Sequence, residues 1–299
     1  MEYTNLGATG LQLSRIAFGG MSLNPDAAAG QRLLQRAHAS GITFFDTADL
    51  YDHGRNEELF GAAFRHCRSE VVLATKVGNQ WRADGQGWDW NPTSAYIRQA
   101  AEASLRRLQT DYLDLYQLHG GTLEDDRDEV LEAFGRLQEE GKIRHYGISS
   151  IRPNVIREYV PGAGLTSVML QLSLLDQRPF EAMLGHLRTH NVGVLARGTL
   201  AQGRLAGKPA TDYLGHPAEQ VAQAAAAVQA LAIELGQTPA TVAGRFVLDT
   251  PGVTAAVLGL RTETQLDEAL QLARCPPLPA EARAALLRAV PANAYEQHR

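Results

Sequence analysis

The sequence predicts a (β/α)8 TIM barrel with an N-terminal β-hairpin, spanning residues 1–299 as a single domain. The first reason is that short apolar runs and helical repeats alternate about eight times, a pattern that favours a parallel sheet. The second is length: such barrels need about 250 residues, and this chain has 299. The third is the segment Gly19-Gly20-Met21-Ser22-Leu23 after the first strand, which lacks the G-x-G-x-x-G spacing of an open dinucleotide-binding sheet.

The expected elements follow in chain order. Residues 2–14 form the hairpin, with Gly7-Ala8-Thr9-Gly10 as its turn. We expect Asp26, Asn56 and Thr238 to cap helices, because short polar side chains accept hydrogen bonds from the free N–H groups of a helix start. Ser94 and Pro217 begin two further helices. The expected barrel strands are 15–18, 42–46, 71–75, 112–118, 143–148, 168–172, 192–195 and 254–258.

Composition and charge exclude several kinds of partner. The net charge of −5 and the pI near 6.0 argue against binding to nucleic acid or to an anionic membrane. The only cysteines, Cys67 and Cys275, lie far apart, so neither a disulfide framework nor a thiolate zinc site is indicated. We find no leader segment and no apolar run of membrane-spanning length. These features predict a cytoplasmic protein with a small-molecule ligand.

Three charged or polar residues end successive strands of the expected barrel. Asp46, Lys76 and His119 end the second, third and fourth strands, and Tyr51 lies on the loop after the second. Barrel closure would bring the four together on the face where such barrels build active sites. A phenol with an ordinary pKa near 10 is a poor acid at about pH 7, but a neighbouring ammonium favours the phenolate. Each residue alone is more often structural, whereas their joint placement indicates proton transfer.

With these motifs the chain resembles the aldo-keto reductase family over nearly its whole length. The resemblance implies a (β/α)8 barrel that binds NADPH without a Rossmann loop and interconverts aldehydes or ketones and alcohols, without a metal. Tyr51 is then the general acid, Lys76 activates it, Asp46 pairs with Lys76, and His119 orients the carbonyl. The matching motifs are Phe45-Asp46-Thr47-Ala48 with Tyr51, Thr75-Lys76, Asp114 to His119, Glu140 to Arg144 with Gly147-Ile148-Ser149, and Leu6-Gly7, Gly10-Leu11, Ser14 and Phe18-Gly19.

The same resemblance implies a cofactor site, with some departures from the family pattern. Ser150 stands where Asn is usual, Arg197 replaces an aromatic that stacks on nicotinamide, and Ala269 replaces an adenine-binding Asn. An ungapped alignment puts Met169 at the amide-binding Gln, while Gln171, two residues on, faces the same side of the strand. The expected cofactor-binding residues are Gly19, Gly20, Met21, Asp46, Ser149, Ser150, Gln171, Arg197, Gly198, Thr199, Leu200, Gln202, Lys208, Gly259, Arg261, Gln265 and Glu268.

Two other functions remain open from the sequence. Some relatives of this family look like redox-sensing subunits of channels, which hold NADPH and turn over slowly. A barrel lyase would instead form a Schiff base on Lys76, which the neighbouring Asp46 disfavours by keeping the amine charged. The loops that shape the substrate site are expected at 79–92 and after residue 200. Trp81, Trp88 and Trp90 form either an aromatic wall there or a cap on the barrel rim, and the sequence leaves the substrate and the oligomeric state open.

Overall fold

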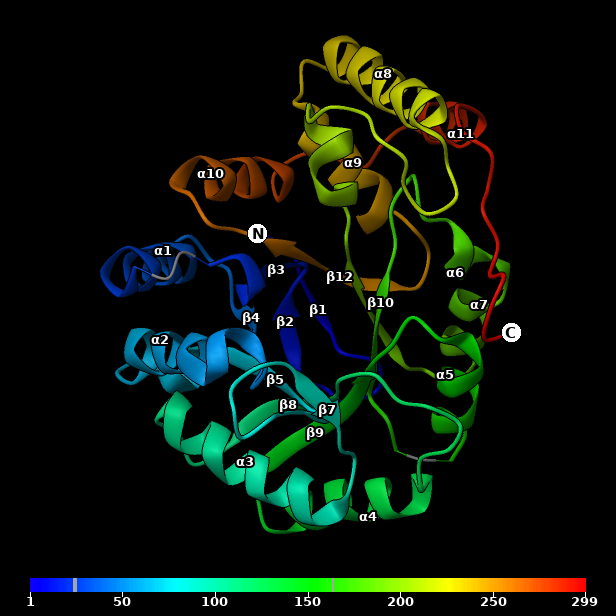
Figure 1. Cartoon of the computed structure of the whole chain (residues 1–299). Helices are drawn as coiled ribbons and strands as arrows, with labels where there is room; N and C mark the ends of the chain where they lie inside the picture. Colours follow the sequence, from blue (N-terminus) through cyan, green and yellow to red (C-terminus); the bar gives the residue numbers. More distant parts are fainter. Residues whose placement is uncertain (24–25, 163) are drawn as a thin grey trace.

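A computed structural model describes residues 1–23, 26–162 and 164–299, and its centre is a closed barrel of eight parallel strands (Figure 1). All eight expected strands are present, and their ends differ from the expected ones by at most two residues. Around the barrel they run in the order β10, β11, β12, β3, β4, β5, β8, β9. The strands are β3 (Ile16–Gly19), β4 (Phe44–Asp46), β5 (Val72–Val77), β8 (Leu113–Leu118), β9 (Ile143–Ser149), β10 (Ser167–Gln171), β11 (Gly193–Arg197) and β12 (Val253–Gly259).

The N-terminal hairpin closes one end of the barrel. Strands β1 (Tyr3–Asn5) and β2 (Gln12–Ser14) pair antiparallel, as expected. Leu6 and Leu13 beside them are fully buried and belong to the apolar cluster that fills the barrel interior. Since the hairpin precedes the first barrel strand, it covers the amino ends of the strands. Ligands therefore enter from the opposite, carboxyl end.

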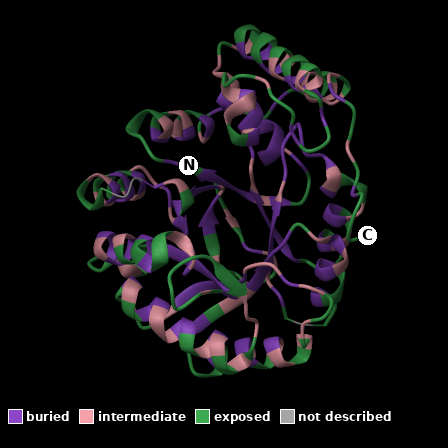
Figure 2. Cartoon of the chain, in the orientation of Figure 1, coloured by how far each residue is buried: buried purple, intermediate pink, exposed green. Residues whose placement is uncertain are grey.

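Helices surround the barrel, and their apolar faces are buried against it while their outer faces are exposed (Figure 2). Asp26 caps α1 by accepting hydrogen bonds from the N–H groups of Ala28 and Ala29, and Thr238 caps α9, as expected. No helix in the described ranges is long and apolar enough to cross a membrane. The helices are α1 (Ala27–Ala39), α2 (Arg55–Phe64), α3 (Ser94–Leu108), α4 (Arg127–Glu139), α5 (Pro153–Tyr159), α6 (Arg178–Glu181), α7 (Met183–Thr189), α8 (Ala218–Leu235), α9 (Pro239–Leu248), α10 (Glu263–Leu272) and α11 (Ala280–Arg288).

The prediction that Asn56 caps the second helix is wrong. Helix α2 begins at Arg55, two residues earlier than a cap at Asn56 would give, because Gly54 adopts a left-handed backbone with φ of 87° and so turns the chain directly into the helix. Asn56 is buried in the first turn, where its amide donates to the Gly20 carbonyl at 2.9 Å and its side-chain oxygen accepts from Thr47 at 2.6 Å. It therefore joins three segments near the carboxyl end of the barrel.

The tryptophan-bearing segment is a hairpin, where the sequence had suggested an irregular loop. Strands β6 (Asn79–Trp81) and β7 (Trp88–Trp90) pair antiparallel, with Trp81 opposite Trp88 and Asn79 opposite Trp90. The hairpin follows β5 directly. It therefore projects from the barrel end that carries Lys76.

Candidate active site

A polar layer at the carboxyl end of the barrel follows from the alternation of side chains along its strands. Phe44, Ala74, Leu115, Met169 and Leu195 belong to the apolar cluster of the barrel interior. Residues two positions further along each strand point to the same side. Those residues are Asp46, Lys76, Gln117, Gln171 and Arg197.

A buried ion pair lies at the centre of this layer. Lys76 Nζ is 2.7 Å from Asp46 Oδ2 and donates a second hydrogen bond, also of 2.7 Å, to the Thr47 carbonyl. The two charged side chains are almost fully buried. Burial disfavours the ammonium, but the attraction of Asp46 and of Tyr51 outweighs it, so the pKa of Lys76 is raised above its ordinary value. Lys76 therefore stays charged, which disfavours the Schiff-base lyase.

Tyr51 lies against this ion pair. It is half-buried at the start of a short 3₁₀ helix, Tyr51–Gly54, and Lys76 Nζ is 5.2 Å from the centroid of its ring. Tyr51, after Asp46, is among the causes that raise the pKa of Lys76 against the lowering effect of burial. The Tyr51 ring also meets the His119 ring edge to face, with centroids 6.0 Å apart. The structure thus brings all four residues together, as the sequence predicts.

His119 is uncharged at neutral pH. Burial, followed by repulsion from Lys76 and Arg197, lowers its pKa from 6.5 to about 3. Its Nδ1 is buried without a hydrogen-bond partner in the described structure. A neutral imidazole can donate a hydrogen bond from one nitrogen to a carbonyl oxygen without competing as an acid.

We expect the imidazole of His119 to stay neutral from about pH 5 to pH 8 in long-range ¹H–¹⁵N NMR spectra, assigned with His119→Asn. The unfolded chain takes up this proton below pH 6.5, whereas folded His119 does so only near pH 3. His119 therefore lowers the stability of the fold progressively as the pH falls from about 6.5 to about 3. A His119 titration with a midpoint near the ordinary value would contradict the geometry described above.

Gln171 and Arg197 meet beside this centre. Arg197 donates to Gln171 Oε1 at 3.3 Å, and Gln171 donates to the Tyr213 hydroxyl at 2.8 Å. Met169 is instead buried among the apolar side chains inside the barrel. Gln171, two residues on, is thus the amide that faces the barrel mouth. Tyr213 was not among the residues predicted for the site. It lies in a loop, and no local sequence pattern indicates its hydrogen bond with Gln171.

Several expected cofactor residues border the same opening. Ser149 and Ser150 are buried at the end of β9, and Thr199 is buried just after β11 with a hydroxyl that has no partner in the described structure. Gly20 is packed so closely that an added Cβ would lie 2.6 Å from the Phe60 ring. Met21, in contrast, is 72% exposed. The remaining residues of this set are Gly19 and Gly259 at the ends of β3 and β12, and Gly198, Leu200, Gln202 and Lys208 in the segment after β11. Of these, Gln202, Lys208 and Gly259 are exposed.

The start of α10 forms a separate group. Thr262 caps the helix through Gln265 N–H at 3.2 Å, and the Gln265 side chain accepts from the Arg261 N–H at 2.9 Å. The Arg261 side chain is exposed, and no partner for it is found among the described residues. Glu268 is half-buried, whereas Ala269 is packed into the core and contributes no polar group. Arg261 is therefore free to bind an anion.

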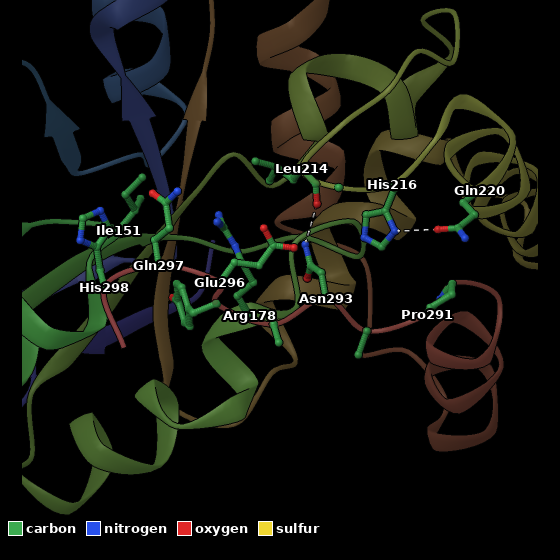
Figure 3. Close-up of a pocket in the computed structure, with 14 residues that line it drawn as sticks. Ile151, Arg178, Leu214, His216, Gln220, Pro291, Asn293, Glu296, Gln297 and His298 are labelled. Atoms are coloured by element: carbon green, nitrogen blue, oxygen red, sulfur yellow. Dashed lines mark hydrogen bonds between the residues drawn. The ribbon is translucent and has the colours of Figure 1, made fainter.

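A cavity of about 500 Å³ lies beside this site, between the C-terminal tail and the loop before α8 (Figure 3). None of the four residues Asp46, Tyr51, Lys76 and His119 lines it. His216, held by Gln220 at 3.0 Å, lines it, and the Asn293 amide donates to the Leu214 carbonyl at 3.3 Å. Tyr213 connects the cavity to the barrel, since its backbone pairs with His216 and its hydroxyl accepts from Gln171. Among the described residues, no cluster of His, Cys, Asp and Glu is suited to hold a metal.

A closed parallel barrel with a tyrosine, a charged lysine, a carboxylate and a neutral histidine at its carboxyl end defines a barrel enzyme equipped for proton transfer. The model of the Aldo/keto reductase family matches residues 15–289. The chain belongs to this family and is an NAD(P)H-dependent oxidoreductase that acts on carbonyl compounds.

Individual relatives agree with this assignment. The chain is 42% identical to the "Uncharacterized oxidoreductase YqkF" of Bacillus subtilis (strain 168) over the full length of both, and 30% identical to the "Aldo-keto reductase YhdN" of the same organism over 89% of this chain and 87% of that one. Among solved structures, the holo form of aldo-keto reductase AKR11C1 from Bacillus halodurans superimposes with a TM-score of 0.95 at 40% identity, covering 100% of this chain and 99% of that one. Glycerol dehydrogenase AKR11B4 from Gluconobacter oxydans gives 0.84 at 27% identity, covering 96% and 94%.

Proposed function

We propose that this enzyme reduces aldehydes or ketones to alcohols, or runs the reverse reaction, with NADPH as the hydride source and Tyr51 as the general acid. The observation that carries the proposal is the contact of Tyr51 with both the Lys76–Asp46 pair and the neutral His119. When bound, the reduced nicotinamide supplies a hydride to the carbonyl carbon. Tyr51 donates its proton to the carbonyl oxygen, and His119 holds that oxygen by a hydrogen bond. One hydride and one proton convert the carbonyl to an alcohol.

The charge on Lys76 supports the role of Tyr51. An ammonium beside the phenol stabilises the phenolate that remains after proton donation. Asp46, 2.7 Å from Lys76, keeps the ammonium in place. In the reverse direction the same phenolate accepts the proton of the alcohol.

The residues around the barrel mouth fit a bound nicotinamide nucleotide. Asp46 Oδ1 and the Thr199 hydroxyl are buried and lack partners in the described structure, so each can hydrogen-bond a ligand. Ser149, Ser150 and Gln171 offer groups for the carboxamide, and the planar Arg197 guanidinium can lie against the nicotinamide ring. The fold also superimposes more closely on the holo form of AKR11C1, with a TM-score of 0.95, than on its apo form, with 0.86.

A preference for NADPH follows from the free Arg261 side chain. NADPH carries a 2′-phosphate, for which a guanidinium offers charge-assisted and potentially bidentate hydrogen bonds. Such bonds contribute about 1.5–3 kcal/mol, so we expect Arg261→Ala to weaken NADPH binding by about ten- to a hundredfold. NADH, which lacks the phosphate, serves as the internal control and should bind almost as before. Fluorescence titration of both cofactors measures this, and equal losses would show that Arg261 does not recognise the phosphate.

The activity itself is tested by incubating the enzyme with NADPH or NADH and a panel of aldehydes and ketones, and following the loss of nicotinamide absorbance. We expect steady-state turnover with NADPH on simple aldehydes. Tight NADPH binding with only slow turnover would instead favour the redox-sensing subunit. None of the relatives described above carries a name that suggests such a subunit.

A further inference from the structure

We propose that the tryptophan hairpin, residues 79–90, is a positioning element that fixes both Tyr51 and His119, with Trp81 and Asn79 as its positioning residues. The proposal rests on the proposed function, because it assigns a role to residues that hold Tyr51 and His119 in place. Neither Trp81 nor Asn79 belongs to the polar layer of the barrel. They contact residues next to Tyr51 in the chain and the backbone of His119.

Trp81 holds the chain on both sides of Tyr51. Its indole N–H donates to the carbonyl of Leu50, the residue before Tyr51, at 3.2 Å. Its ring stacks on His53, two residues after Tyr51, with centroids 3.7 Å apart and planes 23° from parallel. A single side chain therefore restrains both ends of a short segment whose centre is the proposed general acid.

The segment needs such a restraint because its backbone is unfavourable. Asp52 and His53 both adopt left-handed conformations, with φ of 46° and 53°. Residues other than glycine rarely take this conformation, and it persists only where surrounding contacts hold it. Stacking on Trp81 supplies such a contact at His53. Without it the backbone after Tyr51 can relax to a more favourable conformation, which moves the phenol away from Lys76.

Packing on the neighbouring helix restrains this region only partly. A cavity of about 230 Å³ is lined by residues of the Tyr51 segment, of the hairpin and of α3, including Asp49, His53, Trp81 and Tyr96. Among the described residues, the only hydrogen bond from the Tyr96 side chain to this loop is a long one, of 3.5 Å, to Asp49. The Trp81 contacts therefore carry much of the restraint on this side.

The hairpin also reaches the strand end that carries His119. The Asn79 side chain donates to the His119 carbonyl at 3.1 Å. Opposite Asn79 in the hairpin, the Trp90 ring covers Gly78 and Gly120, where an added Cβ would lie 2.5 Å and 3.3 Å from it. Trp90 is anchored by its N–H to Asp125 at 2.8 Å. One hairpin thus links the proposed proton donor to the residue that orients the carbonyl.

The test is a double-mutant cycle between Trp81 and Tyr51. Trp81→Phe keeps an aromatic ring for His53 but removes the N–H, and we expect it to lower kcat by roughly two- to tenfold, the effect of one hydrogen bond. Trp81→Ala removes both contacts and should lower kcat by more. In a Tyr51→Phe background, Trp81→Phe should have almost no further effect, because the residue it positions has lost its function. The dissociation constant for NADPH should be unchanged in every variant.

A matched control separates positioning from general damage to the hairpin. Arg82→Ala removes an exposed ion pair with Asp89 inside the hairpin, 2.7 Å long, and leaves the contacts of Trp81 intact. We expect wild-type kcat. An equal loss with Arg82→Ala, wild-type kcat with Trp81→Phe, or additive losses in the cycle would each overturn the inference. Near wild-type activity of Tyr51→Phe alone would instead overturn the proposed function.

A second set of variants tests whether the hydrogen bond from Asn79 to the His119 carbonyl positions His119. Asn79→Ala should raise KM for the carbonyl substrate by a few-fold and leave the NADPH dissociation constant unchanged, because a less fixed His119 holds the carbonyl oxygen less well. In a His119→Asn background the same substitution should have almost no further effect on KM. An unchanged KM for Asn79→Ala would remove Asn79 from the positioning element.

Discussion

Tyr51→Phe is expected to lower kcat by a factor of about 10²–10⁴, the usual contribution of a positioned general acid. The substitution removes only the hydroxyl and keeps the ring that meets His119 edge to face. The fold and the cofactor site should therefore survive. Steady-state kinetics with an aldehyde and NADPH measures the loss.

The control for this variant is a fluorescence titration with NADPH, which should give the wild-type dissociation constant. A variant that binds NADPH normally and turns over near the wild-type rate would show that another group donates the proton. A variant that fails to bind NADPH would show that the ring of Tyr51 belongs to the cofactor site.

Lys76→Met should likewise reduce turnover strongly, and it should also destabilise the fold. It leaves Asp46 buried with neither oxygen paired, because Oδ1 already lacks a partner in the described structure. Removing one partner of a buried ion pair typically costs about 3–5 kcal/mol. Burial raises the pKa of such a carboxyl, so the cost is small below the unfolded pKa of about 4 and grows as the pH rises. Denaturant unfolding at pH 5 and pH 8 should show the larger loss at pH 8.

The double variant Asp46→Asn/Lys76→Met separates stability from catalysis. Without the unpaired carboxylate, its stability should recover in part and lose most of its added pH dependence, while turnover stays low. Recovery of turnover in the double variant would contradict the role of the ammonium.

The barrel and its central residues were predictable because both depend on local patterns. A buried strand that turns polar at Asp46 or ends at Lys76 is visible in a few consecutive residues. Barrel closure then determines that these strand ends meet. The prediction that Tyr51 joins them is also confirmed, because Tyr51 follows Asp46 by only five residues.

Other features depend on tertiary contacts that no local pattern reveals. Asn56 has the residue type of a helix cap, but Gly54 turns the chain first and leaves Asn56 to bond with Thr47 and Gly20. Tyr213 joins the site through Gln171, 42 residues earlier in the chain. The two strands of the tryptophan hairpin have only 3 residues each, too few for a periodic pattern to predict a strand. The pairing of the hairpin and the contact of Trp81 with Leu50 could therefore not be predicted.

The most direct test of carbonyl reduction by NADPH with Tyr51 as the proton donor combines an isotope label on the hydride with the Tyr51→Phe variant. The enzyme is given NADPH carrying deuterium at the transferable C4 position and an aldehyde that it reduces, and the alcohol is analysed by mass spectrometry. We predict one deuterium on the carbinol carbon with wild-type enzyme, and formation of the same labelled alcohol at least about a hundredfold more slowly with Tyr51→Phe. Alcohol without deuterium, or labelled alcohol formed at the wild-type rate by Tyr51→Phe, would contradict it.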